Sequence, residues 1–268
     1  MLTLSHLANL MALLFGDRPE TMQLVARNLR QARLVASGGR GRGGARQQPV
    51  HVANMIIAAC AANQVLEAAG TVSTFANLEV VPPSPAVSRR RMRAGETGQT
   101  VPRELLFATR SNARFGPVVA ELVKMAADGR LYSLLMSYVA DFVDRDLLRA
   151  GADAIKRAPP GKKPEATAEL AARMAAHVQT LIDQSAVYLK IGFLRPLPGA
   201  EIEFGTQQAG AATALLRIEF GLPASFVANS RNAPKLNGWR RMDRSHRATI
   251  THRTLLSIGQ AIAAEEGI

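Results

Sequence analysis

The chain has 268 residues, of which 47% are hydrophobic and 20% charged, a balance that excludes a disordered protein and suits one large domain or two small ones. Thirty-three Lys and Arg against 21 Asp and Glu give a net charge of +12, which favours an anionic partner, above all nucleic acid. No apolar run reaches about 18 residues, which excludes a transmembrane helix, and the single cysteine, Cys60, fits a reducing cytoplasm.

The amino-terminal part of the chain has apolar residues at helical spacing. Four segments with this spacing predict helices: 2–15, 20–33, 49–62 and 64–78. Between the second and the third lies the Gly/Arg segment, residues 34–46, which reads LVASGGRGRGGAR and contains no acidic residue. Its first residues, Leu34 and Val35, predict a short strand.

A run rich in proline and arginine, PPSPAVSRRRMRAGETGQTVP, predicts a basic linker after these helices. We place this linker at residues 81–111. It separates a predicted DNA-binding module at 1–80 from a second predicted domain at 112–268.

The second domain is predicted to begin with helices and to end with a sheet. Helical spacing continues over three segments: 112–128, 131–150 and 165–185. The run APPGKKP, residues 158–164, predicts a second linker. The period then changes to two, which predicts four strands before a closing helix at 254–266: 187–193, 200–205, 214–221 and 248–252. The predicted class is α+β and mostly helical, with a winged-helix-like module, central helices and a small antiparallel sheet with helices against it.

Positive charge gathers in three clusters, at residues 18–46, 89–114 and 231–253. Each cluster holds seven Lys or Arg against at most two acidic residues. Such clustering indicates contact with phosphates more strongly than charge diluted over a surface does.

The order of helix, turn, helix, short strand and Gly/Arg tip is the order that a winged helix-turn-helix requires. Its second helix would lie in the major groove of DNA. Glycine suits a wing because the wing must turn tightly and bring its main chain close to the DNA backbone. Arginines at the tip could then reach phosphates or a narrow minor groove.

The run VARNLRQARLVASGGRGRGG resembles the recognition helix and wing of winged-helix regulators, in which an LRxAGL pattern leads into a basic wing. It is also similar to the opening of proteins encoded by bacteriophages and prophages of Gram-negative bacteria. In those proteins a TPxxAANLLxA-like helix follows, and this chain has QPVHVANMIIA there. The resemblance covers residues 1–62, and it departs at Ala32-Arg33, where the regulators have Ala-Gly.

The resemblance implies DNA contacts from five side chains: Gln23, Arg27, Arg30, Arg40 and Arg42. The basic clusters add seven candidate DNA-binding arginines: Arg33, Arg46, Arg89, Arg90, Arg91, Arg240 and Arg241.

Catalytic groups are few. The five histidines show no metal-ligand spacing, so we expect no metal site and no cofactor. His246 and His252 flank a strand in a basic segment, where we interpret them as phosphate contacts. Glu201 and Glu203 lie on one side of a strand and, with Glu219, could hold Mg²⁺ for a nuclease. The preferred interpretation of these carboxylates is a solvated outer face.

The sequence predicts a cytoplasmic, nucleoid-associated protein that binds double-stranded DNA as a homo-oligomer and has no catalytic residues. The first interpretation is a bacterial or phage transcriptional regulator. The alternatives are a phage genome-packaging or assembly component and, third, the metal-dependent nuclease. The second domain would serve oligomerisation or bind another phage or host protein, and no membrane contact is expected.

Overall fold

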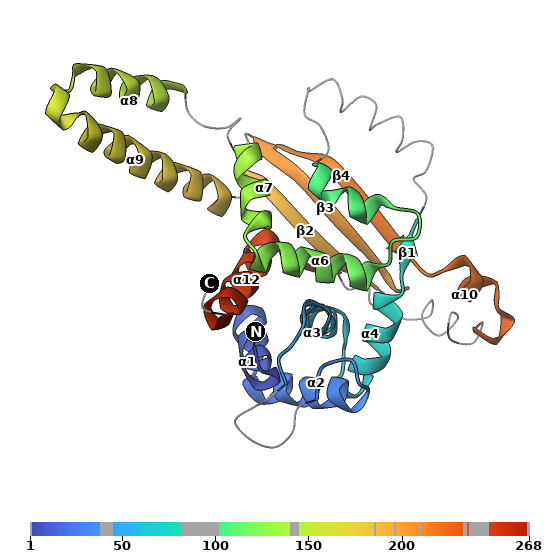
Figure 1. Cartoon of the computed structure of the whole chain (residues 1–268). Helices are drawn as coiled ribbons and strands as arrows, with labels where there is room; N and C mark the ends of the chain where they lie inside the picture. The colour runs from blue at the N-terminus through green and yellow to red at the C-terminus, as the bar shows by residue number, and fades with distance from the viewer. Residues whose placement is uncertain are drawn as a thin grey trace.

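The computed structural model combines a group of helices at the amino end, a five-stranded antiparallel sheet and a helical arm that projects from the body (Figure 1). This arrangement confirms the predicted α+β, mostly helical class. The structure describes the following residues: 2–37, 45–81, 102–139, 145–184, 186–195, 197–208, 211–232, 235 and 247–266.

The amino-terminal helices follow the predicted order: α1 (Leu4–Phe15), α2 (Pro19–Gln31), α3 (Pro49–Ala61) and α4 (Ala68–Ala76). Thr3 starts α1 because its hydroxyl accepts the N–H of His6, and Gly16 ends it with a left-handed φ of 69°. Proline occupies the first position of both α2 and α3, where its missing N–H costs nothing. Helix α3 is apolar nearly all round because α1 and α2 pack on one side of it and α6 (Phe115–Ala127) on the other.

The sheet has the strand order β1-β4-β3-β2-β5, and every neighbouring pair is antiparallel. Its strands are β1 (Glu79–Val80), β2 (Val187–Leu194), β3 (Gly199–Gln208), β4 (Ala211–Gly221) and β5 (Arg247–Thr251). The last four confirm the predicted strands within a few residues. Alternation along the strands, interrupted by a register shift between Phe204 and Gly205, gives the sheet two different faces. Ile202 pairs with Ile191 and Ile218 on the apolar face, and Glu203 pairs with Arg217 on the polar face.

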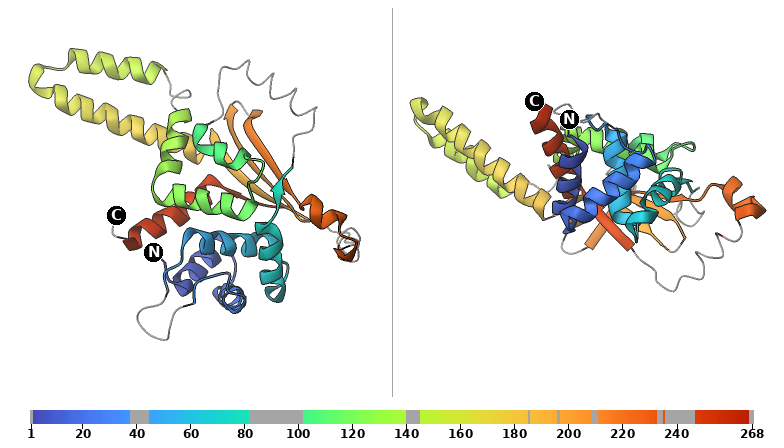
Figure 2. Two further views of the ribbon diagram at one scale, coloured as in Figure 1. Left: turned by 45° about the vertical axis from the view of Figure 1, so that its right-hand side comes forward. Right: turned by 90° about the horizontal axis from the view of Figure 1, so that it is seen from below.

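Helices cover the apolar face of the sheet and leave the polar face outward (Figures 1 and 2). Besides α4 and α6 these are α7 (Arg130–Val139) and α12 (His252–Glu266). Phe115 at the start of α6 stacks edge-on against Phe193 of β2 at 5.5 Å between ring centroids, and it also contacts Phe220 of β4. The buried core therefore runs without interruption from the amino-terminal helices to the sheet.

The arm is an antiparallel pair of helices, α8 (Arg145–Arg157) and α9 (Lys163–Asp183) (Figures 1 and 2). Gly151 lets the two approach closely, because a Cβ there would collide with Leu170. Pro160–Lys162 forms a short 3-10 turn between them. The predicted linker at 158–164 is therefore wrong as a linker: it is the turn of a helical hairpin.

Shorter elements complete the chain: η1 (Val65–Glu67), η3 (Arg103–Thr109), α10 (Ala224–Ala228) and η6 (Ser230–Asn232). The predicted division into 1–80 and 112–268 stays a prediction, and residues 82–101 of the predicted linker lie outside the described part of the chain. In the parts of the chain that are described, no helix combines the length and apolar character needed to cross a bilayer.

Candidate nucleic-acid interface

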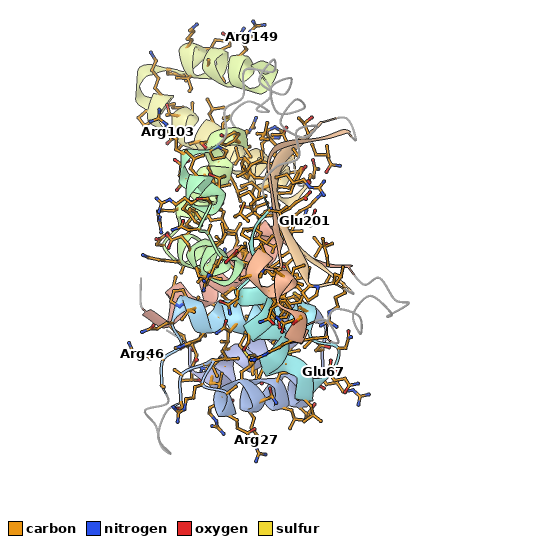
Figure 3. All side chains as sticks on the ribbon, turned by 90° about the vertical axis from the view of Figure 1, so that its right-hand side faces the viewer. Arg27, Arg46, Glu67, Arg103, Arg149 and Glu201 are labelled. Carbon is orange, nitrogen blue, oxygen red and sulfur yellow. The ribbon has the colours of Figure 1, made fainter. Side chains whose placement is uncertain are left out.

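Helix α2 presents one face to solvent at the end of the molecule, and we call the four residues along this face the outer stripe. Glu20, Leu24, Arg27 and Gln31 follow each other at steps of four, three and four residues and are all exposed. The opposite side of the helix is buried against the core through Met22, Val25, Ala26 and Leu29. Figure 3 shows Arg27 pointing away from the protein.

Two arginines lie in the carboxyl-terminal half of this helix and a third follows its end. Arg27, Arg30 and Arg33 are exposed, and no described carboxylate lies within ion-pairing distance of any of them. Their charges are thus not neutralised within the described protein and are available to phosphates.

Arg33 is held in an unfavourable backbone conformation. Its φ is +58°, and it is the only non-glycine residue with a positive φ in the described regions. The N–H of Leu34 donates to the carbonyl of Leu29 at 2.9 Å and that of Arg33 to Arg30 at 3.0 Å, a Schellman end in which glycine usually takes this place. An L-residue costs about 1–2 kcal/mol there. Glycine would adopt this conformation without that cost.

We expect Arg33→Gly to raise the free energy of unfolding by about 1 kcal/mol, because it relieves this backbone strain. If Arg33 contacts a phosphate, the same change lowers DNA affinity about fivefold at 0.15 M salt. This follows because each phosphate contact contributes about 0.9 to the slope of log affinity against log salt concentration. Urea unfolding and fluorescence anisotropy measure the two effects. Arg33→Lys is the control, since it keeps charge and strain. If R33G bound DNA as tightly as the wild type, Arg33 would not be a contact.

The Gly/Arg segment is closed at its base by side chains rather than by a strand pair. The N–H of Ala36 donates to Oε1 of Gln47 at 3.0 Å, and Nε2 of Gln47 donates to the carbonyls of Ala36 and Ala45. Nδ2 of Asn54 donates to the carbonyl of Leu34 at 2.7 Å. The strand predicted at Leu34 and Val35 is therefore wrong, because the buried amides of Gln47 and Asn54 satisfy this backbone instead.

The second arm of the segment pairs with the amino end of the chain. Arg46 forms an isolated antiparallel bridge with Thr3, and the N–H of Gln47 donates to the carbonyl of Leu2 at 2.9 Å. Arg46 is exposed, and Figure 3 places it away from Arg27. Residues 38–44, with Arg40 and Arg42, lie outside the described residues.

Gln23 is less available for DNA than the resemblance implies. Its Nε2 lies 3.0 Å from Oδ1 of Asn9 and 3.2 Å from both the carbonyl and the hydroxyl of Ser5, so it ties α2 to α1. Its amide nitrogen is engaged within the protein, and its assignment as a DNA contact stays a prediction.

Sequence reasoning missed a shallow groove beside Gln23 that Pro19, Glu20, Leu24 and Arg27 also line. Leu24 is half exposed in it. In a major groove, an apolar side chain contacts the thymine methyl and a carboxylate accepts from cytosine N4. The four-three-four spacing of the outer stripe was the signal that could have found Glu20 and Leu24.

The remaining predicted contacts are not brought to this site by the described structure. Five candidate arginines lie outside the described residues: Arg89, Arg90, Arg91, Arg240 and Arg241. His246 also lies outside. His252 is fully buried, so its interpretation as a phosphate contact is wrong. Its Nδ1 accepts the N–H of Leu189 at 3.5 Å and its Nε2 donates to the carbonyl of Ile182 at 3.2 Å, which joins α12, β2 and α9.

The carboxylates considered for a nuclease surround an arginine on the polar face of the sheet. Nη2 of Arg217 binds Oε2 of Glu201 at 2.8 Å, and its Nε lies 3.4 Å from Glu219. Glu203 is 4.0 Å from Arg217 and accepts the hydroxyl of Tyr188 at 2.8 Å. The guanidinium occupies the space between the three, and no set of acidic, His and Cys side chains that could hold a metal occurs among the residues described.

This network corrects the interpretation of a solvated face in one respect: Glu201 is only 4% exposed, and its ion pair compensates its burial. Burial, followed by the hydrogen bond to Glu203, raises the pKa of Tyr188. The thiol of Cys60 lies inside α3, and burial raises its pKa to about 12, so it is a core side chain rather than a nucleophile.

Comparison of the chain with protein-family models, with curated proteins and with solved structures finds no match in any of the three.

Proposed function

We propose that the chain is a DNA-binding protein that holds duplex DNA against the outer stripe of α2 and the Gly/Arg segment. One observation carries the proposal: Arg27 and Arg30 in the last turns of α2, and Arg33 just after its end, are exposed and without a described acidic partner. Such cations gain binding free energy from phosphates by releasing condensed counterions.

A role in transcriptional regulation, the first interpretation of the sequence, requires base reading as well as phosphate contact. Glu20 and Leu24 are the side chains of the outer stripe that can supply it, at the amino-terminal end of α2 ahead of the arginines. The engaged amide of Gln23 favours the second candidate, a packaging or assembly role with little sequence preference, because it removes one reader of base edges.

The proposal is tested with Arg27→Ala/Arg30→Ala. Loss of two phosphate contacts is expected to lower duplex affinity about 30-fold at 0.15 M salt and to reduce the salt slope by roughly two units. Anisotropy titrations from 50 to 300 mM salt measure both quantities.

The control is Lys124→Ala/Arg173→Ala, which removes the same charge from exposed positions on α6 and α9. Both variants should unfold at the wild-type temperature. If the two variants bound DNA equally well, α2 would not be the interface. A wild-type protein that binds no duplex at 50 mM salt would remove the proposed function altogether.

A further inference from the structure

A second group of cations lies at the end of the arm. Lys156 and Arg157 end α8, Lys162 ends the turn, and Lys163 begins α9. We call these four residues the arm tip. All of them are exposed, and the tip holds three of the six lysines of the chain.

The charges of the arm tip have no partner within the described protein. No carboxylate of the described residues ion-pairs with any of them, although Arg173 on the same arm pairs with Glu169 at 2.6 Å. Lys162 and Lys163 also stand at the amino end of a 21-residue helix, where the helix dipole disfavours cations. An anion that bound between the four side chains would relieve the repulsion among the cations and that between the cations and the helix dipole.

The arm is fixed firmly enough to position its tip. Val178 and Ile182 at its root are buried in the core. The N–H of Gln207 in β3 donates to the carbonyl of Ala186, directly after α9, at 2.7 Å, and His252 holds the carbonyl of Ile182. The tip is therefore carried on a helical hairpin whose root packs against the sheet.

The arm and α2 lie at opposite ends of the molecule. Figure 3 places Arg149, on α8, at one end and Arg27, on α2, at the other, and Figure 1 shows the arm pointing away from the amino-terminal helices. A straight duplex on the outer stripe of α2 therefore leaves the arm tip uncovered.

We propose that the arm tip is a second phosphate-binding surface, so that one chain holds two separate segments of duplex DNA; this rests on the proposed function of α2. Duplex DNA fits this surface because its phosphates form a dense array of negative charge, and four exposed cations without acidic partners gain binding free energy by neutralising it. The protein then bridges DNA segments, whether in a looped operator or in a packaged genome.

The test is a capture assay in which an immobilised duplex retains a second, fluorescent duplex only when protein bridges the two. At 0.1 M salt we expect the variant K156A/R157A/K162A/K163A to lose at least tenfold in captured fluorescence. Its affinity for a single duplex, which α2 provides, should stay within about threefold of the wild type. Lys162→Arg/Lys163→Arg should retain bridging, since it keeps the charge.

Lys162→Ala/Lys163→Ala is compared with the charge-matched Lys124→Ala/Arg231→Ala, whose positions are exposed and lie on α6 and η6, outside the arm. Melting temperatures establish that each variant is folded. Equal loss of capture by these two variants would overturn the proposal, because total charge and not the arm tip would then decide. Undiminished capture by the four-residue variant would also overturn it, since pairs of chains would bridge through α2. Binding of one duplex without any capture by the wild type would end the bridging proposal and leave the function of α2 intact.

Discussion

An alanine at Gly259 is expected to destabilise the protein by about 3 kcal/mol, the upper end of the usual cost of overpacking a core. Helices α6 and α12 cross at this glycine. A Cβ there would collide with the carbonyl carbon and oxygen of Ala126 and lie 2.8 Å from the nitrogen of Ala127. These are backbone atoms, so no rotamer change can relieve the collision and the helices must move apart.

Gly70 provides the matched control, because it also lies in a helix, α4, and a Cβ there would meet nothing within 4 Å. Gly70→Ala is expected to stabilise the protein by about 0.5–1 kcal/mol through its higher helix propensity. Urea unfolding of the two variants should thus move in opposite directions. A G259A variant within 0.5 kcal/mol of the wild type would show that α6 and α12 do not cross as closely as described.

This crossing matters to the proposed interface because α12 also touches the amino-terminal helices. Oε1 of Glu265 lies 2.9 Å from Nδ1 of His6, at the start of α1. Helix α1 in turn holds α2 through Gln23. We therefore expect looser packing of α12 to weaken the support of α1 for α2, the helix that carries Arg27 and Arg30.

The strands and most helices were predictable because their pattern is local. From Val187 to Phe193 every second side chain is apolar and buried, a period that a single segment reveals. The buried side of α2 was likewise predictable from the spacing of Met22, Val25 and Leu29. The orientation of the helix followed, and with it the exposure of Arg27 and Arg30.

Partners distant in sequence were not predictable. Val35 is of a residue type that favours strands. The backbone on either side of it is instead bonded by side-chain amides from distant positions: Ala36 by Gln47, 11 residues on, and Leu34 by Asn54, 20 residues on. Gln23 had the type of a base-reading residue, and only the packing of α1 shows that Ser5 and Asn9 engage its amide nitrogen.

The arm was missed for a different reason. Pro159, Pro160 and Gly161 have the composition of a flexible linker, and composition does not show whether the helices on either side lie against each other. The close approach of Gly151 to Leu170 does show it. The resulting hairpin brings two short basic runs together into one tip.

Replacing Gln47 with methionine, which has a similar volume and no hydrogen-bonding amide, is expected to destabilise the protein by about 2–4 kcal/mol. Gln47 is 2% exposed, so water cannot replace its contacts. The variant leaves the N–H and carbonyl of Ala36 and the carbonyl of Ala45 without the partners they have now. Each orphaned buried group costs about 1–3 kcal/mol, reduced where the backbone relaxes toward solvent.

The same variant tests whether the closed base of the Gly/Arg segment serves DNA binding. Gln47 bonds both Ala36 and Ala45, and Arg40 and Arg42 lie between these two residues in the sequence. We therefore expect the variant to remove the phosphate contacts proposed for these two arginines. Loss of two contacts would lower affinity about 30-fold at 0.15 M salt, measured at a temperature where the variant is folded. Gln260→Met, an exposed change on α12, is the control and should alter stability by less than about 0.5 kcal/mol. A Q47M protein that is destabilised yet binds DNA like the wild type would show that the outer stripe of α2 binds without the segment. A Q47M protein as stable as Q260M would show that these buried amide contacts contribute nothing to the fold.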